Sequence, residues 1–247
     1  MSKEAERGYL SATGEAGRAH SLYKPFSDQY CGVNLASIGA IMTLMPSAPA
    51  RVLDLGCGGA WTSVFYALCG YRVVGQDIAS DMIELAVENR NRHGLSSDQL
   101  SFVCDDYESM TAQNEFDCAI FFDSLHHADN EASAIRAAYS ALKPGGILIT
   151  HEPGKGHSTS PHSIAAMEQY GVNERDMPPH LIIKHGLEAG FQEYRVLPIP
   201  PDLLNAFYER RYEKPWFSRQ GFNVMRRVWR MIYSPVLTNS SIVVLTK

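Results

Sequence analysis

The stretch that decides the fold reads Arg51-Val-Leu-Asp-Leu-Gly-Cys-Gly-Gly-Ala-Trp-Thr-Ser63. It predicts an apolar strand at Arg51–Leu55, a turn containing Gly56, Gly58 and Gly59, and a helix from Trp61 to Leu68. This order is typical of the first unit of a nucleotide-binding α/β domain. Glycine suits the turn because it adopts backbone angles that a β-carbon disfavours. It also lets a ligand approach the main chain closely. The positive N-terminal end of the next helix then points at that ligand.

A second strand, Tyr71-Arg-Val-Val-Gly-Gln-Asp77, ends in a carboxylate 21 residues after Gly56. One strand-helix-strand unit returns the chain to the same sheet edge over about that distance, and a carboxylate there can bind both hydroxyls of a ribose. These residues indicate either a dinucleotide or another adenosine compound as the ligand.

The composition is that of an ordinary globular protein. The 247 residues are 45% hydrophobic and 20% charged, and they predict one large domain or one domain with an insertion. The net charge of −5 disfavours nucleic acid as a main partner. Residues 1–20 lack the apolar core of a signal peptide, no apolar run reaches membrane-spanning length, and the five cysteines are scattered without a C-x-x-C pair. We therefore expect a cytoplasmic protein with reduced core thiols.

Strands and helices alternate along the chain, which predicts a parallel sheet with helices on both faces. Residues 1–20 are expected to be mobile, and Leu35, Ile38, Met42 and Met45 predict one face of a helix that ends before Pro46. After Asp77 we predict a helix at Ala79–Arg92, strands at Leu100–Cys104 and Phe116–Phe122, a helix at Glu131–Leu142 and a strand at Ile147–Thr150.

Polar residues gather just after the predicted strands. They are the glycine turn, Asp77, the pair Asp105-Asp106, Asp123 with His126-His127, and His151-Glu152. Ligands of open α/β sheets bind at the carboxyl ends of the strands. A single carboxylate there is commonly a helix cap, but polar residues or glycines after consecutive strands are better explained by a binding site.

Together these segments resemble the class I methyltransferases that use S-adenosylmethionine. The resemblance rests on Val52–Gly58, Val74–Met82, Phe102–Asp106, Phe116–His127 and Leu142–Ile149. One departure is Ala60, where the family usually has a third glycine. The resemblance implies a Rossmann-like, seven-stranded, mostly parallel sheet with a reversed last strand, and Phe191–Leu197 and Ser241–Thr246 suit the last two strands.

The resemblance also implies cofactor-binding roles. Asp54 and the backbone of Gly56, Cys57 and Gly58 would hold the methionine part of S-adenosylmethionine. Asp77 would bind the ribose, and Ile78 would pack on the adenine. Asp105 or Asp106 would accept a hydrogen bond from the adenine amino group, and Asp123 would lie near the amino-acid end.

The methyl acceptor must lie behind an electrophilic methyl group, so positioning supplies much of the acceleration. A base adds a factor of about 10²–10⁴ if the acceptor is a hydroxyl. The candidates for this catalytic role are His126, His127, His151 and Glu152, and each histidine could instead only bind main chain. Our hypothesis is that His127 or His151 is the base. The pattern assigns no residue as a metal ligand.

Two insertions complete the predicted organisation, which is an N-terminal flap and helix at residues 1–45 and a methyltransferase domain at 46–247. The insertions span about residues 152–179, a substrate loop, and 200–238, which is helical. The segment from Asp202 to Tyr233 contains seven basic and three acidic residues. Its net charge is therefore +4, and the remainder of the chain has a net charge of −9. This segment could be a helical cover that solvates its arginines, or a contact with a phosphate group or a membrane surface.

The sequence therefore predicts methyl transfer to a small-molecule acceptor. The segment Asp123-Ser-Leu-His126 lacks the Asn-Pro-Pro-aromatic motif that family members acting on exocyclic amino groups often carry, which favours an oxygen acceptor. That acceptor would belong to a sugar, glycoconjugate or secondary metabolite, and it could be phosphorylated or lipid-linked. The alternatives are a protein that only binds S-adenosylmethionine and a nicotinamide-dependent dehydrogenase, in which Asp105-Asp106 would have no role.

Overall fold

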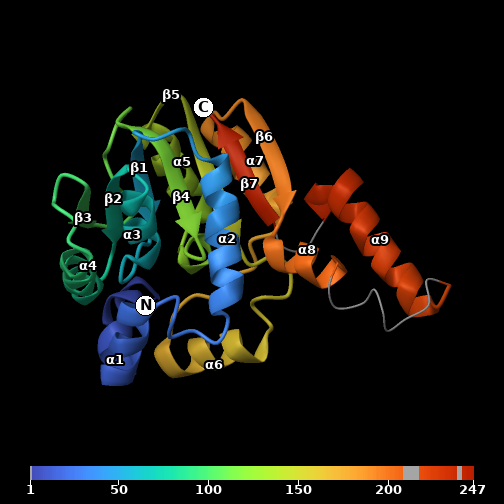
Figure 1. Ribbon diagram of the computed structural model, residues 1–247, viewed down its shortest axis with the longest axis horizontal. Coiled ribbons are helices and arrows are strands. Elements are labelled where there is room, and N and C mark those ends of the chain that lie inside the picture. Colours follow the sequence, from blue (N-terminus) through green and yellow to red (C-terminus); the bar gives the residue numbers. More distant parts are fainter. Residues whose placement is uncertain (1, 208–216, 238–240) are drawn as a thin grey trace.

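The computed structural model describes residues 2–207, 217–237 and 241–247 (Figure 1). Seven strands form one sheet in the order β3-β2-β1-β4-β5-β7-β6. The strands are β1 (Arg51–Leu55), β2 (Arg72–Asp77), β3 (Leu100–Cys104), β4 (Phe116–Phe122), β5 (Leu142–Glu152), β6 (Glu193–Pro198) and β7 (Ser241–Thr246). The first five pair in parallel, whereas β7 is antiparallel to both β5 and β6. The predicted Rossmann-like sheet with a reversed last strand is confirmed.

Helices cover both faces of the sheet because its strands are apolar on both sides. Helices α2 (Cys31–Leu44) and α3 (Trp61–Leu68) pack on one face with Cys118, Ile120 and Phe122 of β4. Helices α5 (Glu131–Ala141) and α7 (Pro179–Ala189) pack on the other face with Ala119 and Phe121. Alternate residues of one strand therefore belong to two separate cores.

The N-terminal segment is ordered, and the prediction that residues 1–20 are mobile is wrong. Helix α1 spans Ser2–Tyr23 with a non-helical Gly14, and Figure 1 shows it below the sheet, beyond the end to which β4 points. Leu10 is buried, and the charged side chains find partners far along the chain, such as Lys3 with Asp106 and Arg18 with Glu88. The sequence pattern suggests that these charged side chains are solvated. In the structure they instead join α1 to α4 (Ser80–Arg92) and to the loop after β3.

Other boundaries also differ from the prediction. Strand β5 begins before the Lys143-Pro-Gly-Gly146 turn and continues to Glu152. The expected substrate loop contains α6 (Pro161–Tyr170), and the second insertion contains α8 (Pro200–Phe207) and α9 (Arg219–Tyr233). Residues 208–216 and 238–240 of that insertion lie outside the described residues. In the predicted flap region at residues 1–45, the aromatic side chains of Tyr23, Phe26 and Tyr30 are exposed, and their role as a flap over the ligand stays a prediction.

The cysteines are all free, but only Cys57 and Cys118 are buried. Cys69 and Cys104 are exposed, so the expectation of core thiols holds for some of the five and not for these two. Among the described helices, none combines the length and apolar character that crossing a membrane requires.

Candidate active site

The glycine turn after β1 adopts left-handed backbone conformations at Gly56 (φ 70), Gly58 (φ 51) and Ala60 (φ 63). A β-carbon at position 56 would lie 2.6 Å from Cβ of Ser124, whereas one at position 58 would meet no atom within 4 Å. Gly56 is therefore required by a close protein contact as well as by its φ. Gly58 borders open space, which suits a backbone that a ligand approaches.

Asp54 lies buried under this turn, near the end of β1. Its Oδ2 accepts hydrogen bonds from Thr62 Oγ1 (2.7 Å) and Ser63 Oγ (2.5 Å) in the first turn of α3. Burial raises the pKa of Asp54 to about 6, although the two hydroxyl groups oppose the rise. A carboxylate that is costly to ionise would gain from a cationic ligand such as an ammonium group.

Asp77 links the end of β2 to the same turn. Its Oδ2 accepts from the Gly58 N–H at 2.8 Å, and its Oδ1 accepts from the Ala79 N–H at 3.0 Å. Burial raises the pKa of Asp77, and these hydrogen bonds limit the rise. The following residue, Ile78, is partly exposed beside it. Each Asp77 oxygen keeps a second lone pair, so a sugar hydroxyl could still donate to it.

The structure separates the roles of Asp105 and Asp106. Asp106 is paired with Lys3 Nζ at 2.5 Å and also accepts from the Glu108 N–H at 2.9 Å. Asp105 is exposed, and its side chain accepts from the Asp106 N–H at 2.8 Å. Asp105 is therefore the more accessible of the two candidates for an adenine amino group.

Glu152 organises the end of β4. It is 1% exposed, and its Oε1 accepts from the N–H groups of Ser124 (3.0 Å) and Leu125 (2.8 Å). His126 Nδ1 lies 2.7 Å from Glu152 Oε2. Four donors satisfy this carboxylate: the His126 ring and three main-chain N–H groups, counting the weaker His126 N–H at 3.3 Å. Glu152 is better placed to shape the turn at residues 124–126 than to move a proton.

His151 and Asp123 form a pair at the ends of β5 and β4. His151 Nδ1 lies 3.1 Å from Asp123 Oδ1, and the ring stacks on Phe122 with centroids 4.7 Å apart. Burial favours the neutral ring, but the charge and hydrogen bond of Asp123 outweigh burial and raise the pKa of His151. His151 Nε2 is buried and has no hydrogen-bond partner among the described residues. Asp123 adopts a left-handed conformation (φ 49) and is exposed.

His127 belongs to a different environment, that of α1 and the segment after α6. Its Nδ1 lies 2.7 Å from the Asn173 carbonyl oxygen and 3.4 Å from Glu6 Oε1. Burial would lower its pKa, but Glu6 and then Glu174 outweigh burial and raise it to about 9. His127 is therefore a cation at neutral pH, which makes it a poor general base.

Several residues at this edge were missed by sequence reasoning. Glu6 and Lys3 of α1, Tyr107 after β3, and Asn173 and Glu174 after α6 all contact predicted site residues. Tyr107 Oη, for example, donates to the Ser124 carbonyl at 3.1 Å. These residues lie in segments that the sequence predicts to be mobile or loops. Such a prediction does not say which residues they contact, so it could not identify them as part of the site.

The predicted residues thus form three groups at one sheet edge. The first is Asp54, the glycine turn and Asp77, and the second is the short helix Leu125–His127 with Glu152, which contacts it. His151 with Asp123 is a third, separate contact between β4 and β5. The fold and this edge define a nucleotide-binding α/β protein.

Comparisons with known proteins relate part of this chain to a known family. Residues 52–146 match the family described as methyltransferase domain. A ubiquinone biosynthesis O-methyltransferase of Xanthomonas oryzae pv. oryzae is 33% identical over 120 residues, which is 47% of this chain and 48% of that protein. The chain thus matches about half the length of these curated relatives.

Solved structures agree on the fold. An S-adenosylmethionine-dependent methyltransferase from Mesorhizobium loti is 16% identical and aligns over 87% of this chain and 100% of its own, with a TM-score of 0.62. A Haemonchus contortus phosphoethanolamine N-methyltransferase 2, in complex with S-adenosyl-L-methionine, is 20% identical and aligns over 97% of this chain and 58% of its own, with a TM-score of 0.63. Residues 52–146 of this chain therefore form a methyltransferase domain, and its fold is shared with S-adenosylmethionine-dependent methyltransferases.

Proposed function

We propose that this protein transfers a methyl group from S-adenosylmethionine to an oxygen atom of a small-molecule acceptor. The observation that carries the proposal is the unit formed by Asp54, the left-handed turn at Gly56–Gly58 and Asp77 at the carboxyl edge of the sheet. A buried carboxylate with a raised pKa suits a cationic ligand, and Gly58 leaves space for one.

These residues fit the cofactor by their chemistry. Asp54 and the main chain of Gly56, Cys57 and Gly58 would hold its methionine end, and Asp77 would accept from the ribose hydroxyls. Ile78 would contact the adenine, and Asp105 would accept from the adenine amino group because Asp106 is already paired with Lys3. When bound, the cofactor supplies an electrophilic methyl group. What the protein adds is orientation of the acceptor and exclusion of water.

His151 is the base that this geometry favours. Asp123 contacts Nδ1 and so orients the ring, while Nε2 is buried and has no partner among the described side and main chains. An acceptor hydroxyl would satisfy that nitrogen and donate its proton to it. His127, as a cation held by Glu6 and Asn173, is less suited to this step. His126 is also less suited, because its Nε2 already faces Glu174 Oε2 at 3.7 Å.

The name of the curated relatives supports an oxygen acceptor. It names ubiquinone biosynthesis and gives no support to a sugar or glycoconjugate in particular. The acceptor we propose is therefore a small molecule with a hydroxyl group, which includes the expected secondary-metabolite class.

Calorimetry and turnover test this function. We expect the protein to bind S-adenosylmethionine and its demethylated product, and not a nicotinamide dinucleotide. With a hydroxyl acceptor found by screening, His151→Ala should lower turnover at saturating cofactor by about 10²–10⁴-fold. His162→Ala, at an exposed histidine in the insertion at about residues 152–179, should leave turnover unchanged. Absence of cofactor binding would refute the proposal. Full turnover of His151→Ala would show that His151 is not the general base.

We further infer that α9 rests on an anionic lipid surface, in line with a lipid-linked or phosphorylated acceptor. Four exposed apolar residues recur at intervals of three and four, so they form one face of the helix: Phe222, Met225, Trp229 and Ile232. Arg226 and Arg230 lie one turn apart beside that face. A helix with this pattern lies in the interface of a membrane.

Vesicle sedimentation tests the lipid contact. Vesicles that contain phosphatidylglycerol should bind the protein, and vesicles of phosphatidylcholine alone should bind it less. The double change Arg226→Gln with Arg230→Gln should weaken binding about 30-fold, because each basic residue near such a surface contributes about 1 kcal/mol. Phe26→Ser, at an exposed aromatic residue outside the insertion, serves as the control. Equal sedimentation of the double variant and the wild type would contradict a role for α9.

A further inference from the structure

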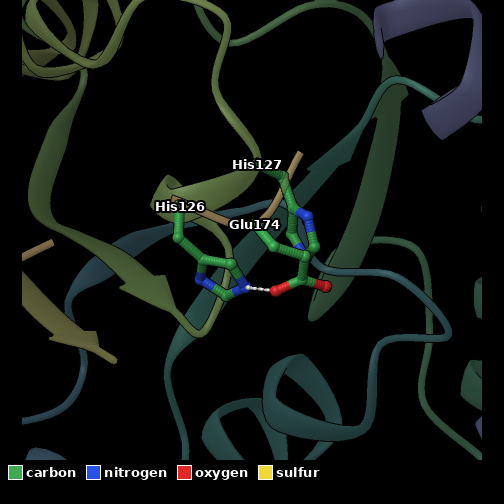
Figure 2. A group of neighbouring side chains, drawn as sticks. All are labelled: His126, His127 and Glu174. Carbon is green, nitrogen blue, oxygen red and sulfur yellow. Dashed lines mark ion pairs between the residues drawn. The ribbon is translucent and has the colours of Figure 1, made fainter. Parts of the chain in front are cut away.

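Three side chains that could ligate a metal ion meet at the end of β4. His126 and His127 come from the short helix after that strand, and Glu174 comes from the segment between α6 and α7. One candidate ligand atom from each lies within 4.8 Å of the others, and Figure 2 shows the two rings close to the Glu174 carboxylate. His126 Nε2 lies 3.7 Å from Glu174 Oε2.

Both histidines are held at Nδ1 by an acceptor. Glu152 Oε2 lies 2.7 Å from His126 Nδ1, and the Asn173 carbonyl oxygen lies 2.7 Å from His127 Nδ1. An acceptor at Nδ1 keeps a proton there, so Nε2 is the nitrogen that an ion can bind, and at His127 the ion must displace a second proton from it. Metal-binding histidines are commonly oriented in this way by a carboxylate or carbonyl behind the ring.

Glu174 is also oriented by a partner. Its side chain is 9% exposed, and His157 Nε2 lies 2.5 Å from its Oε2. The His157 ring packs edge-on against that of His126, with centroids 4.9 Å apart. A carboxylate that faces three imidazole rings is thus fixed from two sides, and it has a second oxygen to offer.

One of the three ligand separations is already close to that of an occupied metal site, and all three are within 4.8 Å. Metal–nitrogen and metal–oxygen bonds of about 2.0–2.2 Å place the ligands of a tetrahedral ion about 3.3 Å apart. The separation of 3.7 Å between His126 and Glu174 is close to that value. Two imidazoles and one carboxylate suit divalent zinc, iron or cobalt better than magnesium or calcium, which prefer oxygen ligands.

We propose that His126, His127 and Glu174 bind one divalent transition-metal ion, with Glu152, Asn173 and His157 orienting the three ligands. Three protein ligands leave a coordination position open for water or another oxygen ligand. Ion binding at this cluster is independent of the methyl transfer proposed above, and its test needs no acceptor.

The test uses the full chain after treatment with a chelator and dialysis, at about pH 8 because protons compete with the ion for imidazole nitrogen. Titration with zinc sulfate in a calorimeter should show saturable binding of one ion per chain. Cobalt(II) should give visible absorption bands of a bound ion without a thiolate charge-transfer band. A strong thiolate band would place the ion at the exposed Cys69 or Cys104 and overturn the assignment.

Variants separate the cluster from adventitious sites. Glu174→Gln and His127→Asn should each weaken zinc binding at least tenfold. His157→Asn, which removes only an orienting partner, should weaken it by about 10–100-fold. His162→Ala removes an exposed histidine of the same insertion and should bind as the wild type does. Circular dichroism of each variant checks that it is folded.

The proposal fails if the folded wild type shows no saturable binding, or if folded Glu174→Gln binds zinc as tightly as the wild type. Either result would mean that His126, Glu174 and His157 form only a hydrogen-bonded network between the end of β4 and the insertion after β5.

Discussion

Ala60 shows how one residue tolerates a backbone conformation that favours glycine. It has φ 63 at the N-cap of α3, and its side chain is fully buried. A left-handed conformation costs an L-residue about 1–2 kcal/mol. A buried methyl group returns about 0.8 kcal/mol, and alanine loses less backbone entropy on folding than glycine does. The terms nearly cancel, which explains an alanine where the family usually has a glycine.

We therefore expect Ala60→Gly to change the free energy of unfolding by less than about 1 kcal/mol. Ala60→Val should destabilise the protein by about 2 kcal/mol or more, because a β-branched side chain fits a left-handed backbone poorly and the site is full. Urea denaturation of both variants measures this difference. A large loss of stability in Ala60→Gly would show that methyl burial dominates.

Asp54 links stability to cofactor binding. Its pKa is raised from 3.8 to about 6 in the folded state, so its contribution to stability is fully present below pH 4 and is lost as the pH rises through 6. At pH 7 its ionisation costs up to about 3 kcal/mol. Asp54→Asn should thus stabilise the free protein at pH 7 by about 1–3 kcal/mol and should have little effect near pH 4.

The same substitution should weaken binding of S-adenosylmethionine about tenfold or more, because an amide lacks the charge that an ammonium group would meet. Thermal unfolding at both pH values and calorimetry at pH 7 measure the two effects. Ser109→Ala, at an exposed serine after β3, is the control. Loss of stability at pH 7 would contradict the assigned cost of ionising Asp54.

At the scale of the elements, helical glycines differ by what surrounds them. A β-carbon on Gly186 of α7 would lie 2.5 Å from Leu245 Cδ1 of β7, and Leu245 is fully buried. A β-carbon on Gly39 of α2 would meet no atom within 4 Å. The absence of a side chain at Gly186 thus lets α7 approach the sheet, whereas at Gly39 it only weakens the helix.

Gly186→Ala should therefore destabilise the protein by about 1–3 kcal/mol through overpacking, and Gly39→Ala should stabilise it by about 0.5–1 kcal/mol. Chemical denaturation of this pair measures the difference, and each variant serves as the control for the other. Stabilisation by both would mean that Leu245 moves aside at little cost.

The elements also show where sequence patterns succeed. Strands β1, β3, β4 and β7 have the predicted bounds, because short apolar runs between turn residues indicate buried strands. Helix α1 was missed because its charges pair with Asp106 and Glu88, about 70 to 100 residues away along the chain. Local periodicity carries no information on such partners.

At the scale of the whole molecule, the insertion with α9 is peripheral to the core. Gly221 and Met231 are the buried residues among those of α9 whose burial is described, and Figure 1 shows the helix to one side of the sheet. An ion pair between Arg227 and Asp202 joins it to α8. Strands β6 and β7 pair directly, with Pro198 opposite Ser241. We therefore expect their pairing to be independent of the insertion.

We expect that replacing residues 208–238 with a short Gly/Ser linker leaves a folded protein, with a midpoint of thermal unfolding lowered by a few degrees at most. A loss of about 1 kcal/mol corresponds to about 2–4 °C for a chain of this size. Differential scanning calorimetry measures this shift. Loss of cooperative unfolding would show instead that the insertion belongs to the core and would correct the predicted organisation.

The sequence by itself determined the first five strands and the side chains at the carboxyl edge, because hydrophobic runs and glycine turns are local signals. The seven-stranded sheet with its reversed last strand was implied by the resemblance to class I methyltransferases. Only the tertiary structure decided which of those side chains meet. It paired His151 with Asp123 and brought Glu174 to His126 and His127. Such contacts depend on packing between segments far apart in the chain, and the local sequence pattern around each residue does not specify them.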